Sequence, residues 1–202
     1  MFIGKWNPSV ILTYIGVGFS LAGIFLILSE RREYAISCLI MAGICDLFDG
    51  KLARSMKRNK EEEEFGIQLD SLADVLSFVV FPVIILLGLE KGNLFSLFSA
   101  FVFAICGIAR LAFFNILASS EEAGSFFRGL PVTYTALALP LIYLLRYVLP
   151  EEVFVLIFQL SFLGIGFFNI LDIKIRKPRG AAYIIFPLLA LAMLWFYGRM
   201  AG

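Results

Sequence analysis

Seven long apolar runs divide this 202-residue chain, and they constrain its fold more than any other feature. A helix of about 20 apolar residues crosses the hydrocarbon core of a bilayer, and each run is close to that length. Short polar joints separate the runs, which favours antiparallel neighbours. The sequence therefore predicts an all-α fold, a polytopic transmembrane helical bundle that forms a single domain over residues 1–202. The runs cover roughly residues 10–29, 35–55, 69–89, 94–118, 131–149, 152–171 and 182–199.

Composition agrees with a membrane protein and excludes several kinds of chemistry. Hydrophobic residues make up 60% of the chain and charged residues 16%, whereas soluble domains average about 45–50% and 25%. The absence of histidine excludes His-based acid/base catalysis and His-ligated metals, so a general base must be another side chain such as a carboxylate. Cys38, Cys45 and Cys106 lie in apolar runs without C-x-x-C spacing, which indicates packing residues. We expect no nucleic-acid partner.

Lysine and arginine residues predict how the bundle is oriented. With a cytoplasmic N-terminus, most of them lie on the cytoplasmic side, as the positive-inside rule requires. We therefore expect a multi-pass protein of the cell membrane, with residues 1–9 along the membrane interface. The opposite side keeps only Arg31, Arg32, Lys91, Arg146 and Arg199. The cytoplasmic set is Lys51, Arg54, Lys57, Arg58, Lys60, Arg110, Arg128, Lys174, Arg176, Lys177 and Arg179.

Four aspartates stand at the facing ends of two apolar runs. Asp46 and Asp49 are three residues apart at the end of one run, and Asp70 and Asp74 are four apart at the start of the next. Both spacings place the paired side chains on one face of a helix. A carboxylate in a membrane helix costs about 2.5–3.5 kcal/mol on insertion scales, so a functional role is the first expectation. If the two helices are neighbours, all four acids converge near the cytoplasmic surface.

Converging carboxylates are typical ligands of hard cations such as magnesium, manganese and calcium. Gly50 and Ala53 keep the same helix face open, and Arg54 adds a guanidinium that can pair with phosphate. For the two small residues, close helix packing is an equally good explanation when each is taken singly. A cation transporter is an alternative function, although transport sites tend to lie near the membrane midplane.

The complete pattern is Asp46-x2-Asp49-Gly50-x2-Ala53-Arg54, followed by Gly66-x3-Asp70-x3-Asp74. It resembles the signature of the CDP-alcohol phosphotransferase family. The segment between Arg54 and Gly66 is longer than is usual there, and the additional residues fall in the charged tract Lys57–Glu64, where we expect a longer loop or an additional helical turn.

The resemblance implies a core of six helices, to which the seventh run adds one, and a homodimer. It also implies two divalent cations, Mg²⁺ or Mn²⁺, held by Asp46, Asp49, Asp70 and Asp74. Asp74 would be the general base, although spacing alone does not choose among the four acids. The residues that would line the site for a CDP-linked lipid are Gly50, Ala53, Arg54 and Gly66.

A second stretch of the sequence resembles one subgroup of this family. Arg110-Leu-Ala-Phe-Phe-Asn115, followed by Phe127-Arg128-Gly129-Leu130-Pro131, is similar to elements of the membrane-integral phosphatidylserine synthases, although Phe113 or Phe114 replaces a second arginine. This similarity implies that the substrates are CDP-diacylglycerol and L-serine and that CMP is released. Relatives that use glycerol 3-phosphate or inositol phosphate remain the alternative. Arg110, Asn115 and Arg128 are expected to bind serine or a lipid phosphate. The alternatives are pairing with one of the four aspartates for Arg110, helix packing for Asn115 and interfacial anchoring for Arg128.

Overall fold

The computed structural model describes residues 4–89, 93–118, 126–176 and 180–201. Within these ranges nearly all of the backbone is helical, which confirms the all-α prediction. The elements are α1 (Pro8–Leu28), α2 (Arg32–Ser55), α3 (Lys60–Asp74), the π-helical segment η1 (Val75–Val80), α4 (Phe81–Leu89), α5 (Leu94–Ala118), β1 (Phe126–Arg128), η2 (Val132–Tyr134), α6 (Thr135–Tyr143), η3 (Leu144–Tyr147), α7 (Glu151–Ile170), β2 (Lys174–Arg176) and α8 (Ala182–Met200).

Five helical segments are long and apolar enough to cross a membrane, so the chain is a multi-pass membrane protein. They are Pro8–Leu28, Lys60–Leu89, Leu94–Ile116, Glu151–Ile170 and Tyr183–Met200. Two of the seven apolar runs do not correspond to any of these five segments. The helix α2 has 24 residues, but its second half carries the acids and bases discussed above, and Val132–Tyr147 is a shorter apolar helix. The seventh run is helical and spans 19 residues as α8.

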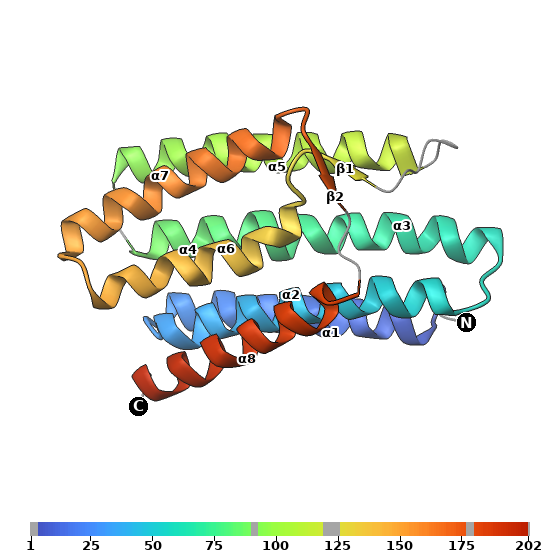
Figure 1. The fold of residues 1–202 in the computed structure, drawn as a ribbon, viewed down its shortest axis with the longest axis horizontal. Helices are drawn as coiled ribbons and strands as arrows, with labels where there is room; N and C mark the ends of the chain where they lie inside the picture. Colours follow the sequence, from blue (N-terminus) through green and yellow to red (C-terminus); the bar gives the residue numbers. More distant parts are fainter. Residues whose placement is uncertain (1–3, 90–92, 119–125, 177–179, 202) are drawn as a thin grey trace.

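The helices form three rows in Figure 1. The helices α5 and α7 pack together in one row, α3 and α4 follow one another in the middle row, where α6 overlaps α4 in this view, and α1, α2 and α8 form the third. The core between α5 and α7 is aromatic: the ring centroids of Phe103 and Phe162 are 4.9 Å apart, and Phe158 packs against Phe162 at 5.5 Å. The helix α2 packs against α1, α6 and α8.

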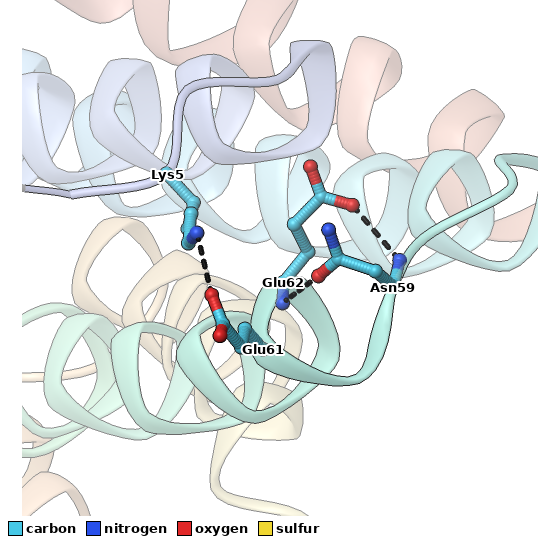
Figure 2. A network of polar contacts seen from close by, with 4 residues as sticks. All are labelled: Lys5, Asn59, Glu61 and Glu62. Atoms are coloured by element: carbon cyan, nitrogen blue, oxygen red, sulfur yellow. Dashed lines mark hydrogen bonds and ion pairs between the residues drawn. The ribbon is translucent and has the colours of Figure 1, made fainter.

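The start of α3 is fixed by a capping box, shown in Figure 2. The Asn59 side chain accepts a hydrogen bond from the Glu62 N–H, and the Glu62 carboxylate accepts one from the Asn59 N–H, both at 2.9 Å. The Lys5 ammonium donates to Glu61 at 2.8 Å, and this hydrogen bond raises the pKa of Lys5. The second half of the charged tract is therefore the first turn of α3 rather than a loop.

The middle row changes from α-helix to π-helix immediately after Asp74. Between Val75 and Val80 the helix is wider, and the Phe81 N–H donates to the Leu76 carbonyl, five residues back. Pro82 follows, and it has no N–H to continue the regular pattern. Single π-helical turns inside helices are frequent at functional sites. This one determines how the end of α3, with its two aspartates, is presented to the neighbouring helices.

A two-stranded antiparallel sheet joins segments that are far apart in the sequence. Phe127 pairs with Ile175, and Arg128 pairs with Lys174. Gly129 follows with φ +71° and donates its N–H to the Ile173 carbonyl at 3.0 Å. A Cβ atom at this position would collide with the carbonyl oxygen of Asn169, at the end of α7. Glycine is therefore required here by both the backbone conformation and the available space.

Candidate active site

Three of the four predicted acids meet where α2 lies beside α3. Asp46, Asp49 and Asp70 each offer one carboxylate oxygen, and these oxygens all lie within 4.8 Å of one another. The fourth acid, Asp74, is buried one turn further along α3, with its carboxyl group within hydrogen-bonding reach of Asp46. The expected convergence thus appears as a cluster of three acids with Asp74 beside it.

The negative charge of these acids is only weakly compensated by the protein. The Thr13 hydroxyl, on α1, donates to Asp49 at 2.7 Å. Within the described ranges, the ion pairs are Lys5–Glu61 and Lys60–Glu64, and neither involves these four aspartates. Several carboxylates gathered without a paired cation are unfavourable unless a metal ion binds them. The donor set, all oxygen and acidic, fits hard divalent cations.

A cavity of about 610 Å³ lies beside the acids. Its polar end contains the aspartates together with Arg54, and its apolar end continues along α2 to Ile40. Because a helix rises about 1.5 Å per residue, these two ends are about 21 Å apart along α2. The other walls come from α5, β1, η2, α6 and α8. They include Arg110, Phe114, Phe127, Pro131, Thr133, Tyr134, Ala136, Leu137, Gly180, Tyr183, Phe186, Pro187 and Ala190.

Arg110 lies in the wall of this cavity, with only 6% of its surface exposed. Its guanidinium carbon is 4.9 Å from the ring centroid of Phe114 and 5.8 Å from that of Phe127. Its Nε atom is buried and has no hydrogen-bond partner among the described residues. The guanidinium interacts electrostatically with Asp46, Asp70 and Asp74 but forms no ion pair with them within 4.0 Å. Arg110 thus lies in the cavity wall without an ion-pair partner among the described residues.

The residues predicted to line a CDP-lipid site divide into two groups. Gly50 and Arg54 line the cavity. A Cβ atom on Gly50 would lie 3.5 Å from Nη1 of Arg54, so the guanidinium lies next to this glycine. Ala53 and Gly66 are not among the cavity-lining residues, and Gly66 faces the side chain of Arg58 instead.

Asn115 and Arg128 also lie outside the cavity. Asn115, on α5, accepts a hydrogen bond from the Ser71 hydroxyl at 2.7 Å, next to Asp70 on α3. This contact joins α3 to α5 and agrees with a packing role. Arg128 is exposed in β1, while its neighbour Phe127 lines the cavity. The stretch Phe127–Pro131 thus contributes an aromatic ring to the cavity wall rather than a cation.

Sequence reasoning missed Thr13 and the contribution of α8. Thr13 is a polar residue inside an apolar run, and that was its only signal. The helix α8 carries no recognisable motif, yet Tyr183 and Phe186 line the cavity. Phe186 packs edge-on against Tyr134 of η2, with ring centroids 6.0 Å apart. These contacts join distant parts of the chain, and no local sequence pattern predicts them.

The sequence matches the profile of the CDP-alcohol phosphatidyltransferase family over residues 6–164. This range includes the acidic cluster, Arg110 and the strand β1, and it ends within α7. The helix α8 lies outside it.

Several named proteins are similar to this chain. A CDP-diacylglycerol–serine O-phosphatidyltransferase of Saccharomyces cerevisiae is 37% identical over 115 residues, covering 53% of this chain and 41% of the yeast protein. One of Methanocaldococcus jannaschii is 39% identical over 105 residues, covering 52% and 48%. An archaetidylserine synthase of Methanothermobacter thermautotrophicus is 32% identical over 122 residues, covering 59% and 51%. The chain thus spans about half the length of these curated relatives, or less. Because the family profile extends over most of the chain and includes all four aspartates, this chain belongs to the CDP-alcohol phosphatidyltransferase family.

Proposed function

We propose that this protein is a phosphatidylserine synthase that transfers the phosphatidyl group of CDP-diacylglycerol to L-serine. The serine hydroxyl oxygen attacks the phosphorus that carries the diacylglycerol, the bond from that phosphorus to CMP breaks, and CMP leaves. The observation that carries the proposal is the three-carboxylate cluster at the polar end of a cavity whose other end is apolar. The names of the similar proteins support serine as the acceptor.

Asp46, Asp49 and Asp70 would hold two divalent cations, Mg²⁺ or Mn²⁺, with Asp74 completing the set. Bound there, the cations would neutralise phosphoryl oxygens and stabilise the departing phosphate. The acids fit this role because they are close together and lack ion-pair partners among the described residues. Thr13 would keep the Asp49 carboxylate oriented through its hydrogen bond.

Asp74 would take the proton of the serine hydroxyl. It lies beside the cluster of three rather than within it, so one oxygen can face the acceptor. A base buried in a membrane protein is shielded from bulk water, which limits competing hydrolysis of the CDP-lipid.

The walls of the cavity suggest how the two substrates would lie. Arg54 would pair with the diphosphate as a fork of N–H donors. Arg110, which lies beside the rings of Phe114 and Phe127, would bind the serine carboxylate. The apolar length of the cavity beside Ile40 and Ala190 would receive an acyl chain, so that the lipid reacts without leaving the bilayer. The predicted orientation puts this chemistry at the cytoplasmic surface.

The test is an assay of CMP release by the full chain in detergent, with CDP-diacylglycerol, Mn²⁺ and one acceptor at a time. We expect release with serine, and Asp74→Asn should lower kcat by roughly 10²–10⁴-fold, the usual contribution of a general base. Asp172→Asn is the matched control, because Asp172 is exposed in the segment between α7 and β2.

Two results would contradict the proposal. Release with glycerol 3-phosphate or an inositol phosphate, and none with serine, would assign the protein to a different branch of the family. Full activity of Asp74→Asn would remove the general base from the mechanism. A parallel assay with an ether-linked CDP-lipid would establish which lipid backbone the apolar part of the cavity accepts.

A further inference from the structure

The helix α8 is held against the bundle by a tyrosine hydroxyl near each of its ends. At one end, Nη2 of Arg54 donates a hydrogen bond to the hydroxyl of Tyr183 at 2.9 Å. At the other end, the hydroxyl of Tyr197 donates to the carbonyl oxygen of Pro140 on α6. Only the first contact is at the cavity, where Tyr183 and Arg54 both line the wall.

Tyr183 contacts two cations that come from one face of α2. Lys51 and Arg54 are three residues apart, which places them on the same side of the helix. The Lys51 ammonium lies 5.2 Å from the centroid of the Tyr183 ring, a cation–π distance. The ring of Tyr183 thus faces one positive charge while its hydroxyl accepts a hydrogen bond from the other.

The geometry leaves most of the Arg54 guanidinium available to a ligand. Its Nη2 is directed to Tyr183, and its Nη1 lies next to Gly50 in the cavity wall. Arg54 forms no ion pair with the described residues. An arginine has five N–H donors, so several remain after one is used. The exposed side chain would otherwise sample many rotamers, and the contact with Tyr183 restricts it to the rim of the cavity.

We propose that Tyr183 is a positioning residue for the substrate diphosphate, acting by holding Arg54 in place before the CDP-linked lipid binds. Ordering a long side chain in advance reduces the entropy that is lost on binding. The proposal rests on the proposed function in one respect, that the cavity takes a CDP-linked donor. It does not depend on serine being the acceptor. It also assigns a role to α8, which lies outside the family match.

The test is Tyr183→Phe in the full chain, which keeps the ring and its contact with Lys51 but removes the hydroxyl. Calorimetry with CDP and Mn²⁺ should show a Kd about three- to tenfold higher than that of the unmodified protein, the usual effect of one hydrogen bond. The KM for CDP-diacylglycerol should rise by a similar factor, while the KM for serine stays within twofold.

Two further variants separate positioning from simple docking of α8. Tyr197→Phe removes the hydroxyl contact at the far end of the same helix, and it should lower the Tm without changing CDP affinity. Arg54→Lys should weaken CDP binding by itself, and adding Tyr183→Phe to it should cause little further loss, because the two residues act through one contact.

Three outcomes would overturn the proposal: unchanged CDP affinity in Tyr183→Phe, equal losses in Tyr183→Phe and Tyr197→Phe, or tighter CDP binding in Tyr183→Phe. The last would mean that Tyr183 competes with the diphosphate for Arg54. If the unmodified protein does not bind CDP, the proposed function itself fails. Release of CMP with a different acceptor would leave the binding test intact.

Discussion

Arg110 is buried beside two neighbouring aromatic rings, and it interacts electrostatically with three carboxylates without forming an ion pair with any of them. Burying an unpaired guanidinium is costly, and the nearby negative charge and the ring faces offset only part of that cost. A serine carboxylate in the cavity would complete its hydrogen bonding. The planar guanidinium suits this task because it can donate two parallel hydrogen bonds to a carboxylate.

Arg110→Lys should therefore raise the KM for serine by roughly 10- to 100-fold, since a hydrogen bond to a charged group contributes about 1.5–3 kcal/mol. Lysine keeps the charge but loses the planar fork. CDP affinity should change by less than about threefold, because Arg54 serves the diphosphate. The measurement is a steady-state titration of each substrate.

Arg146→Lys is the matched control for Arg110→Lys. The Arg146 guanidinium carbon also lies near two rings, 5.9 Å from Tyr143 and 6.0 Å from Phe154, but Arg146 does not line the cavity. Its substitution should leave both KM values unchanged. An unaltered serine KM in Arg110→Lys, or equal changes for both substrates, would remove Arg110 from the acceptor site.

Single residues differ in how far the sequence could predict their place. Asp46, Asp49 and Asp70 could be predicted to converge because helical periodicity fixes which side chains share a face. Thr13 and Tyr183 could not, since each contacts an active-site residue that is distant in the sequence, 36 and 129 positions away. Such partners depend on how helices pack, and periodicity does not specify that.

At the level of elements, the two-stranded sheet of β1 and β2 could not be predicted, because the apolar runs indicate helices throughout. Its three-residue strands are too short to produce a periodic pattern. The sheet nevertheless places Phe127 near Arg110, while Gly129 donates its N–H to Ile173, just after α7, and Leu130 donates to Phe168 in α7. In the structure this stretch joins β1 to the end of α7, and the binding role expected for Arg128 stays a prediction.

Gly129→Ala should destabilise this junction and lower activity. A non-glycine residue at φ +71° is strained, and the added Cβ would collide with the Asn169 carbonyl. Strain at such positions costs about 1–3 kcal/mol, and relieving the collision would move Phe127 away from Arg110. We expect a lower Tm in detergent and a higher KM for serine.

Gly180→Ala is the matched control for the Tm, because Gly180 also has a positive φ, +51°, but no described residue other than its chain neighbours has an atom within 4 Å of a Cβ there. Only the backbone strain should appear there, about 1–2 kcal/mol. If both variants lose the same stability, the close approach of Gly129 to Asn169 is not tight, and the backbone after β1 can accommodate the added methyl group.

For the whole molecule, the apolar runs predict an all-α membrane bundle because bilayer thickness sets helix length, although two of the seven runs do not match the five long apolar segments. The arrangement of the helices could not be predicted, since most of them are apolar on several sides and hydrophobicity does not choose their neighbours. Even the acidic helix α2, which hydropathy alone does not mark as a span, is enclosed by α1, α6 and α8. The helices α6 and α8 line the cavity beside α2, together with α3, α5, β1 and η2.

Metal binding should stabilise the whole bundle, because Asp46 and Asp49 lie on α2 and Asp70 lies on α3. At a free Mn²⁺ concentration of 100 Kd, binding to the folded state alone contributes about 2.7 kcal/mol, so the apparent Tm should rise with Mn²⁺ and fall again with a chelator. The stability of Asp70→Asn relative to the unmodified protein should change sign between the two conditions. With the chelator it should be at least as stable as the unmodified protein, because one repelling charge is gone, whereas with Mn²⁺ it should be less stable.

Asp172→Asn, outside the cluster, should follow the unmodified protein in both conditions. If the Tm of Asp70→Asn changes with Mn²⁺ as much as that of the unmodified protein, Asp70 does not hold the metal, and the cluster of three acids has a different purpose.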